Sequence, residues 1–433
     1  MPTLLAFYPA IISYDAHGQI QQLITGKFID HHPIVSTYFL GLYLPLGKLF
    51  HNYEIGALLV SVIQLVTISA VYSFAIHSIK RLNIVGYISL VGIFAVLPLT
   101  NFFNLVWTKD ALFSAFFLAV VVLAYSIIVD ENTNIMTFIL MGLFLIIAIL
   151  LRKNMMYSLV IFVLVLSFSF KKNWKLMITV FVGIIVANGV NMALLKQADA
   201  RKENGVEMLS VPLQQIAFIE KYNWHEVDKA TPKKIDEELL PQAQASTIYN
   251  PEISDGIKWA VDGNLNSLSK ANFVRMWISM VKANPLSAIK ATLLLTRPAW
   301  AMNASIPNFY YSGPVVEMTN VFQNVKDIRR VQTDSRIPKL KEWITDLTYN
   351  NKISKIPLLN VIFKPALGVL LLFGFIVITL LRRQMRVLLV AIMILTYVIG
   401  VLVGPVMLIR YFLPVTVAIL YLIIREMSGN NDK

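Results

Sequence analysis

The amino-acid sequence predicts an all-α polytopic membrane protein. Of its 433 residues, 57% are hydrophobic and only 15% are charged. Soluble domains are about 45–50% apolar and about 25% charged, so this composition excludes a soluble enzyme and a nucleic-acid-binding protein. The sequence has no cysteine, which excludes disulfides and thiolate metal sites. Its net charge of +13 is typical of a membrane protein whose basic loops face the cytoplasm.

Nine apolar stretches have about the length that a membrane-crossing helix needs, which is about 20 residues. A tenth stretch, 34–50, contains Pro45 and two glycines, and we expect it to lie along the outer face as a juxtamembrane helix. The sequence therefore predicts nine to ten membrane helices. The nine stretches cover residues 55–77, 84–101, 111–129, 135–151, 155–170, 174–195, 366–381, 387–403 and 405–424.

The distribution of basic residues predicts the orientation of these helices. With residues 1–54 outside, ten basic residues lie in inner loops or the tail and only three lie in short outer loops. If 34–50 crossed the membrane, the assignment would invert and break the positive-inside rule. We therefore expect a multi-pass cell-membrane protein with a cytoplasmic C-terminus. The inner basic residues are Lys80, Arg81, Lys171, Lys172, Lys175, Arg382, Arg383, Arg386, Arg425 and Lys433.

The chain divides into three predicted regions. Residues 1–195 form an N-terminal membrane module whose first outer loop covers about 11–54. Residues 196–362 hold 17 of the 25 acidic residues, which predicts a mainly helical extracytoplasmic insert. Residues 363–433 form the C-terminal membrane helices and a cytoplasmic tail. The first ten residues are apolar but too short to cross, so we expect that an N-terminal first helix is missing; the alternative is a short interfacial segment.

Three carboxylates are predicted at outer helix ends. Asp15, Asp30 and Asp110 could converge on one cavity. Alternatively, each of them only caps a helix, and Asp110 is well placed to interact with the dipole of its own helix. The acids on the inner side are expected to be solvated. These are Asp130, Glu131, Glu426 and Asp432.

Basic residues on the outer side also need an explanation. Arg410 lies inside the outer end of the last predicted helix, where a charge is costly and marks a functional site by default. Arg152 and Lys153 form a turn between two apolar helices, and Arg297 in the insert is a weaker candidate. The alternative for Arg410 is snorkelling to the headgroups. An anionic lipid headgroup held by arginines, beside a carboxylate that takes a proton, would use all these features.

The histidines give no metal site. His31 and His32 adjoin Asp30, but no third ligand has suitable spacing, so we expect them to orient a substrate or the loop. The sequence contains no phosphate-binding Gly-rich loop, no GxSxG and no HExxH. ATP-driven and protease functions therefore lack support.

The order of these features resembles the GT-C-type glycosyltransferases of Gram-positive bacteria. In particular, it is similar to membrane families related to mannosyl- and arabinosyl-type transferases. The features are, in order, YPAIISYD with a following Gln, HHPIVSTYFLG, WTKDALF, LLRKN, the late insert and IRYFLP. The resemblance covers about residues 1–195 and 363–425.

The resemblance implies roles for individual residues. Asp15 matches the catalytic base of that superfamily, and Asp110 matches its second outer acid. Basic residues are expected to bind the phosphate of a lipid-linked sugar, and the candidates are Arg152, Lys153, Arg297 and Arg410. Other residues are expected to position the acceptor or the outer loop, and they are Tyr14, Gln19, Asp30, His31, His32 and Lys109.

The resemblance also implies the reaction. The donor is expected to be a polyprenyl-phosphate sugar, the acceptor a cell-surface glycan or polymer, and the transfer inverting. Membrane lipids are the other expected partners, and nucleic acid is not one. No cofactor is predicted with certainty, and a divalent cation is left open. The alternatives are a transporter or flippase for lipid-linked sugars and a non-catalytic membrane scaffold. A flippase needs charges near both faces, whereas the sequence places intramembrane charge near the outer face only.

Overall fold

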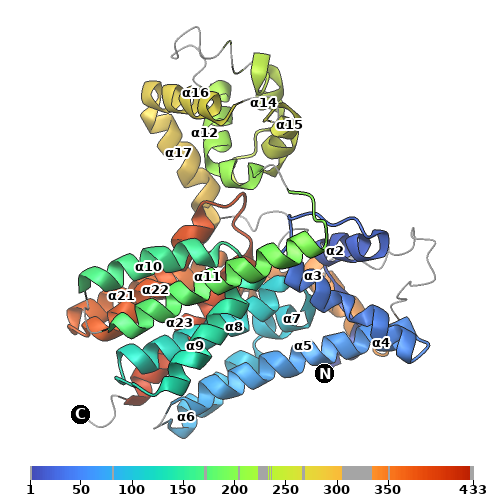
Figure 1. Ribbon diagram of the computed structural model, residues 1–433, viewed down its shortest axis with the longest axis vertical. Coiled ribbons are helices and arrows are strands. Elements are labelled where there is room, and N and C mark those ends of the chain that lie inside the picture. The colour runs from blue at the N-terminus through green and yellow to red at the C-terminus, as the bar shows by residue number, and fades with distance from the viewer. Residues whose placement is uncertain are drawn as a thin grey trace.

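The computed structural model is almost entirely helical, which confirms the predicted all-α fold class (Figure 1). Apolar helices pack into one body, and α12, α14, α15, α16 and α17 form a lobe apart from it. The structure describes residues 2–79, 82–169, 173–202, 205–222, 233, 235, 237–265, 269–304, 334–349 and 352–429.

Helices that fit a membrane span fall at the predicted stretches. Within the described residues, five helices are long and apolar enough to cross, and a bent pair gives a sixth. Three further apolar helices at predicted spans are shorter, at 15 to 17 residues: α9 (Ile135–Leu151), α10 (Met155–Ser169) and α21 (Pro365–Leu381). The chain therefore has the helices of a membrane protein. The five long helices are α5 (Tyr53–His77), α8 (Lys109–Ile128), α11 (Trp174–Gln197), α22 (Met385–Leu402) and α23 (Ile409–Gly429).

The stretch predicted over 84–101 is broken rather than continuous. It consists of α6 (Ile84–Val91), the π-turn η1 (Gly92–Val96) and α7 (Pro98–Leu105), with a 45° bend. A proline disfavours helical backbone in the residue before it, and the residue before Pro98 is indeed non-helical, with ψ 124°. Thr100 donates a hydrogen bond to the carbonyl of Leu97, so a polar side chain satisfies backbone at the break.

Helix α8 is the centre of the apolar body. It packs against α5, α9, α22 and α23, and 94% of its apolar window is buried. A helix that is apolar on every side belongs in such a position. Its side chains therefore fix where the surrounding helices lie, including α23, which carries Arg410.

The stretch 34–50 forms two short helices instead of one span. They are α3 (Ile34–Gly41) and α4 (Tyr43–Leu49), and α4 packs against the start of α5. At Gly56 a side chain would collide with the backbone of α4 at the carbonyl of Tyr43, so the two helices approach as closely as glycine allows.

A two-residue parallel pairing joins distant parts of the chain. After α1 (Pro2–Ala6), β1 (Ile11–Ile12) pairs with β2 (Val106–Trp107), with Ile11 opposite Val106. α2 (Tyr14–Thr25) begins directly after β1, and α8 begins directly after β2. Ser13 caps the first of these helices and Thr108 caps the second. The pairing therefore makes two helices begin at the same place, which we call the site end of the body.

The predicted insert contains two groups of helices. The lobe has its own apolar core, which includes Ile216 and Phe273. By contrast, α19, η8 and α20 follow the lobe in sequence and pack on the main apolar core, through Ile344 for example. The lobe elements are η3 (Val206–Leu209), α12 (Ser210–Tyr222), α14 (Gln242–Ile248), α15 (Asp255–Leu265), α16 (Lys270–Ala283), α17 (Pro285–Thr296) and η5 (Arg297–Ala299). The other group is α19 (Pro338–Tyr349), η8 (Lys352–Lys355) and α20 (Pro357–Ile362).

Backbone hydrogen bonds connect the predicted insert to two loops at the site end. Arg201, after α11, donates to the carbonyl of Phe28 at 2.9 Å and accepts from the amide of Asp30 at 3.0 Å. In the lobe, Ser254 donates to the carbonyl of Pro405, in the loop before α23, at 2.9 Å. The segment between α11 and the lobe is thus attached to the loop that follows α2, and the lobe itself is attached to the loop that precedes Arg410.

Two acids at the opposite end of the body, Asp130 and Glu426, belong to a buried network, which corrects the prediction that they are only solvated. Arg425 lies 2.7 Å from Asp130 and donates to the hydroxyl of Tyr421 at 2.6 Å. Glu426 accepts a hydrogen bond from Tyr125, and Arg425 lies over the ring of Tyr125 at 3.9 Å. Sequence reasoning missed this network because the partners come from helix ends that are far apart in the chain. Of the other two acids, Glu131 pairs with Arg386, and Asp432 lies outside the described residues.

We expect Asp130→Ala to destabilise the protein because it leaves the buried Arg425 without its carboxylate. The expected loss is about 1–3 kcal/mol, measured as a lower unfolding temperature of the purified protein in detergent. Glu131→Gln is the control: its carboxylate is 62% exposed, so the loss should stay within about 0.5 kcal/mol. Equal effects of the two substitutions would contradict the role given to this pair.

Candidate functional site

The parallel pairing brings two similar segments together at the site end. Each segment runs from a strand through a hydroxyl cap to a carboxylate in the first turn of a helix. The segments are Ile-Ile-Ser-Tyr-Asp, which leads into α2, and Val-Trp-Thr-Lys-Asp, which leads into α8. Ser13 donates to the carbonyl of Trp107 at 2.7 Å, which fixes the two segments to each other. The register that starts at Ile11 and Val106 thus leads to Asp15 on one helix and to Asp110 on the other.

Five charged side chains alternate in sign and form one connected set, which we call the charged cluster. Lys109 lies 3.4 Å from Asp15, and Asp15 lies 3.2 Å from Arg410. Arg410 continues to Asp110, with 3.5 Å from Nε to the carboxylate, and Asp110 lies 2.9 Å from Arg152. Each carboxylate is therefore shared by two cations, and Arg410 joins the two halves. The structure brings together residues from the start of α2, the start of α8, the end of α9 and the start of α23.

The cluster is buried to different degrees. Asp110 is fully buried and Arg152 is 8% exposed, whereas the side chains of Asp15 and Arg410 are 15% and 17% exposed. Charges in such a place require compensation, because an unpaired buried charge costs several kcal/mol. Three cations face two carboxylates, so the charged cluster carries one excess positive charge. That balance favours an anionic ligand.

Two groups at the exposed side of the cluster have shifted pKa values. Burial raises the pKa of Asp15, but the cations Arg410 and Lys109 outweigh burial and hold that pKa well below its usual range. Burial and the neighbouring Lys109 lower the pKa of His32 to about 3. His32 is therefore neutral at pH 7, and its Nδ1 lies 3.5 Å from the ammonium of Lys109. Among the described residues, no group of three or more histidine or acidic side chains forms a metal site.

Aromatic rings hold the two arginines, and sequence reasoning missed them. Arg152 lies over the ring of Tyr411 at 4.3 Å, and Arg410 lies 5.3 Å from the same ring and 3.4 Å from its hydroxyl. Tyr397 donates to the backbone carbonyl of Tyr411 at 3.0 Å and lies 5.9 Å from Arg152. Cation–π contacts stabilise a guanidinium while they leave its in-plane donors available. Tyr411 adjoins Arg410 in the sequence, which is a signal for it, but nothing in the sequence points to Tyr397.

The remaining predicted site residues lie around or away from the charged cluster. Asp30 pairs with Lys153 beside it, and the ring of His31 lies 4.5 Å from that of His32. Gln19 is buried and donates to Ser36 and Thr37, so it joins α2 to α3. Arg297 belongs to the lobe, where it lies 3.9 Å from Glu252, and the structure does not bring it to the cluster. Tyr14 begins α2, but its side chain lies outside the described residues.

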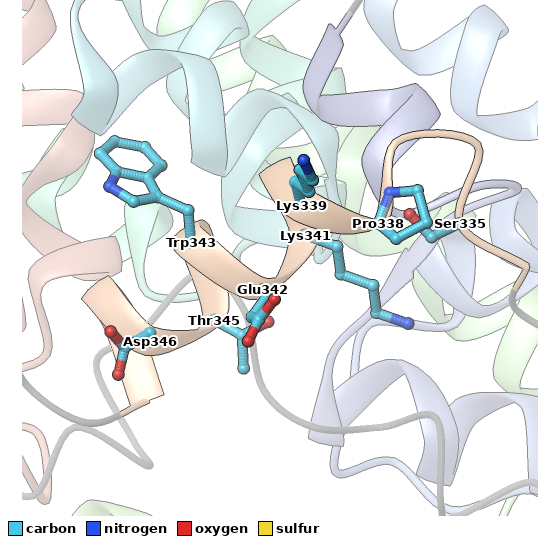
Figure 2. Close-up of a pocket in the computed structure, with 8 residues that line it drawn as sticks. All are labelled: Ser335, Pro338, Lys339, Lys341, Glu342, Trp343, Thr345 and Asp346. Carbon is cyan, nitrogen blue, oxygen red and sulfur yellow. The ribbon is translucent and has the colours of Figure 1, made fainter.

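A surface pocket lies along α19 and is separate from the charged cluster. Figure 2 shows Trp343 and Lys341 pointing to different sides of this helix. None of the lining residues belongs to the charged cluster. They are Ser335, Pro338, Lys339, Lys341, Glu342, Trp343, Thr345 and Asp346.

We expect Asp110→Asn to destabilise the protein more than any change on the exposed side of the cluster. The substitution leaves Arg152 and Arg410 buried without a shared carboxylate, which costs about 3–5 kcal/mol. Thermal unfolding of the purified protein in detergent measures this loss. The double variant Asp110→Leu with Arg152→Met should recover part of it, because it removes both charges and keeps side-chain volume. A double variant no more stable than Asp110→Asn would contradict this account of the pair.

Comparison with known proteins identifies a family. A comparison with curated proteins finds no match, and a comparison with solved structures finds none either. Residues 19–432 match a family described as being of unknown function, DUF6020. The matched residues include four of the five members of the charged cluster, all except Asp15. Because the match covers nearly the whole sequence, the chain belongs to the DUF6020 family.

Proposed function

We propose that the protein is an integral membrane glycosyltransferase. It transfers a sugar from a polyprenyl-phosphate donor to a cell-surface acceptor on the extracytoplasmic face. The observation that carries the proposal is the charged cluster, in which fixed cations with one excess positive charge adjoin a partly exposed carboxylate. Such a site offers both functions that the reaction needs, namely binding of a phosphate and acceptance of a proton.

In the proposed topology this site lies at the extracytoplasmic face of the cell membrane. Nine helices cross the bilayer, while α3 and α4 lie along its outer face. The basic loops after α5, α10 and α21 face the cytoplasm, as the positive-inside rule requires. The site end, where α8 begins and α9 ends, then faces outward together with the lobe. Nucleotide sugars are absent there, so a lipid-linked donor suits the location.

The proposed reaction is a single displacement at the anomeric carbon. The acceptor hydroxyl forms the new carbon–oxygen bond while the bond to the donor phosphate oxygen breaks, so the configuration inverts. Asp15 accepts the proton of the hydroxyl as attack proceeds, which a positioned carboxylate does with typical gains of about 10²–10⁴ in rate. Arg410 and Lys109 stabilise the charge that develops on the leaving lipid phosphate.

The two carboxylates have different roles in this proposal. Asp110 is fully buried and holds Arg152 and Arg410 in place, so it acts as a positioning residue. Asp15 is the more exposed of the two and is the group that meets the acceptor. The loop with Asp30, His31 and His32 lies beside it and would contact the acceptor. Tyr14 and Gln19 belong to the helix that carries Asp15, and Lys153 pairs with Asp30.

One observation favours the second candidate, a transporter or flippase for lipid-linked sugars. The buried Arg425 shows that charge is present at both ends of α23, contrary to the expectation that it lies near the outer face only. The buried network at that end, however, contains one cation, Arg425, and two acids, Asp130 and Glu426, so it has no excess positive charge for a phosphate. A carrier for a lipid phosphate needs a cationic site within the bundle near each face, and the charge balance of the two buried networks therefore favours the transferase.

We expect Asp15→Asn to abolish sugar transfer. The amide cannot accept the proton, so activity should fall at least about 100-fold while the amount of protein in the membrane stays unchanged. The measurement is made in cells of the source organism with the gene deleted and then restored as native protein or as the variant. The sugar composition of purified surface polymers is compared, and immunoblotting measures protein abundance.

Glu131→Gln is the control, because it removes a carboxylate at the opposite end and should restore the sugar fully. A sugar that disappears on deletion and returns only with Asp15 intact supports the transferase and names the donor. Full restoration by Asp15→Asn would show that Asp15 is not the catalytic base. It would then favour a transporter or a scaffold over the transferase.

A further inference from the structure

The cations of the charged cluster that are most open to a ligand already hold a carboxylate. Lys109 and Arg410 both contact the same oxygen of Asp15, at 3.4 and 3.2 Å. Arg410 also has a buried Nε that makes no hydrogen bond, although it lies 3.5 Å from Asp110. An anion that binds to these donors therefore competes with Asp15 for them.

We propose that the donor binds as a singly charged phosphodiester that displaces Asp15 from Arg410 and Lys109, so that binding itself frees the carboxylate to act as the base. This inference rests on the proposed transferase function and adds an order of events to it. In the empty site Asp15 occupies the cations in place of the phosphate. In the loaded site the phosphate occupies them, and Asp15 turns to the acceptor hydroxyl.

The geometry decides which of the two carboxylates gives way. Asp110 is fully buried, contacts Arg152 at 2.9 Å and would deprive that buried arginine of its carboxylate if it moved. Asp15 makes longer contacts and is 15% exposed. It also lies in the first turn of α2, and that helix is only 12 residues long. Displacing Asp15 therefore costs less than displacing Asp110.

The charge balance decides the class of phosphate. The charged cluster has one excess positive charge, and Asp30 and Lys153 beside it neutralise each other. His32, the other titratable group that faces Asp15, is neutral at pH 7 because its pKa is lowered to about 3. A phosphodiester carries one negative charge and neutralises the cluster. A diphosphate diester carries two and leaves an excess negative charge in a poorly solvated place, which is costly.

The exchange also explains how so well paired a carboxylate becomes a base. Arg410 and Lys109 hold the pKa of Asp15 well below its usual range in the empty site, where the carboxylate is therefore a weak base. When a phosphodiester neutralises these cations, the pKa of Asp15 rises, while the group stays ionised at pH 7. Water that enters the empty site accordingly meets a weaker base than an acceptor that enters the loaded one.

The test measures binding of farnesyl methyl phosphate, a singly charged phosphodiester, to the purified full-length protein by calorimetry. Asp15→Asn removes the competing carboxylate, so we expect it to bind the probe at least about fivefold more tightly than the native protein. Glu131→Gln makes the same charge change at the opposite end and should alter the affinity less than about twofold. Farnesol is the uncharged control probe. Asp15→Ser replaces Asp15→Asn if the latter is not monodisperse.

The outcomes separate this inference from the proposed function. Tighter binding by the Asp15 variant alone supports the exchange. If the native protein binds but the variant binds equally or more weakly, the exchange is overturned, while the phosphate site of the proposed function stands. Equal tightening by Glu131→Gln also overturns the exchange, because the effect is then one of net charge. If neither protein binds the probe better than farnesol, both proposals fall.

Discussion

The parallel pairing of β1 with β2 is the constraint on which the site depends. Only two residues of each strand pair, yet they tie the start of α2 to the start of the central helix α8. Each strand leads through a hydroxyl cap, Ser13 or Thr108, into the first turn of a helix that contains a carboxylate. The pairing thus brings Asp15 near Asp110, although the residues between them in the sequence form other helices.

Once two carboxylates lie at this place, burial dictates the rest of the arrangement. A carboxylate out of water requires a cation close by, and a buried cation requires a carboxylate in turn. Arg410 meets this requirement for both Asp15 and Asp110, and α23 can deliver it because that helix packs against α8. The ring of Tyr411 then keeps two arginines near each other that would otherwise repel. The site is therefore a consequence of helix packing as much as of its own residues.

Sequence reasoning identified most of the charged residues but not their pairings. Arg410 stood out because a charge within an apolar stretch is expensive, and the helix ends predicted by hydropathy agree with the structure within a few residues. The kink at Pro98 and the network around Arg425 were missed. A membrane span is recognised by its mean hydropathy. A break within the helix or a charge near its end changes that mean very little, so neither feature was detected. Tyr397 could not be predicted, because its role depends on where α22 packs.

The buried charged networks at the two ends of α8 and α23 differ in charge balance, so the two ends are not equivalent for an anionic ligand. At the site end three cations face two carboxylates. In the buried network at the other end the one cation, Arg425, pairs with Asp130, and a second acid, Glu426, accepts hydrogen bonds from Tyr125 and Gln384. Both groups are satisfied internally, but only the first would gain from binding an anion. Of the two buried networks, only the one at the site end therefore offers an excess positive charge to a lipid phosphate that reaches it within the bilayer. That asymmetry suits an enzyme that works on one face of the membrane, and it disfavours a carrier that must release the same ligand on both.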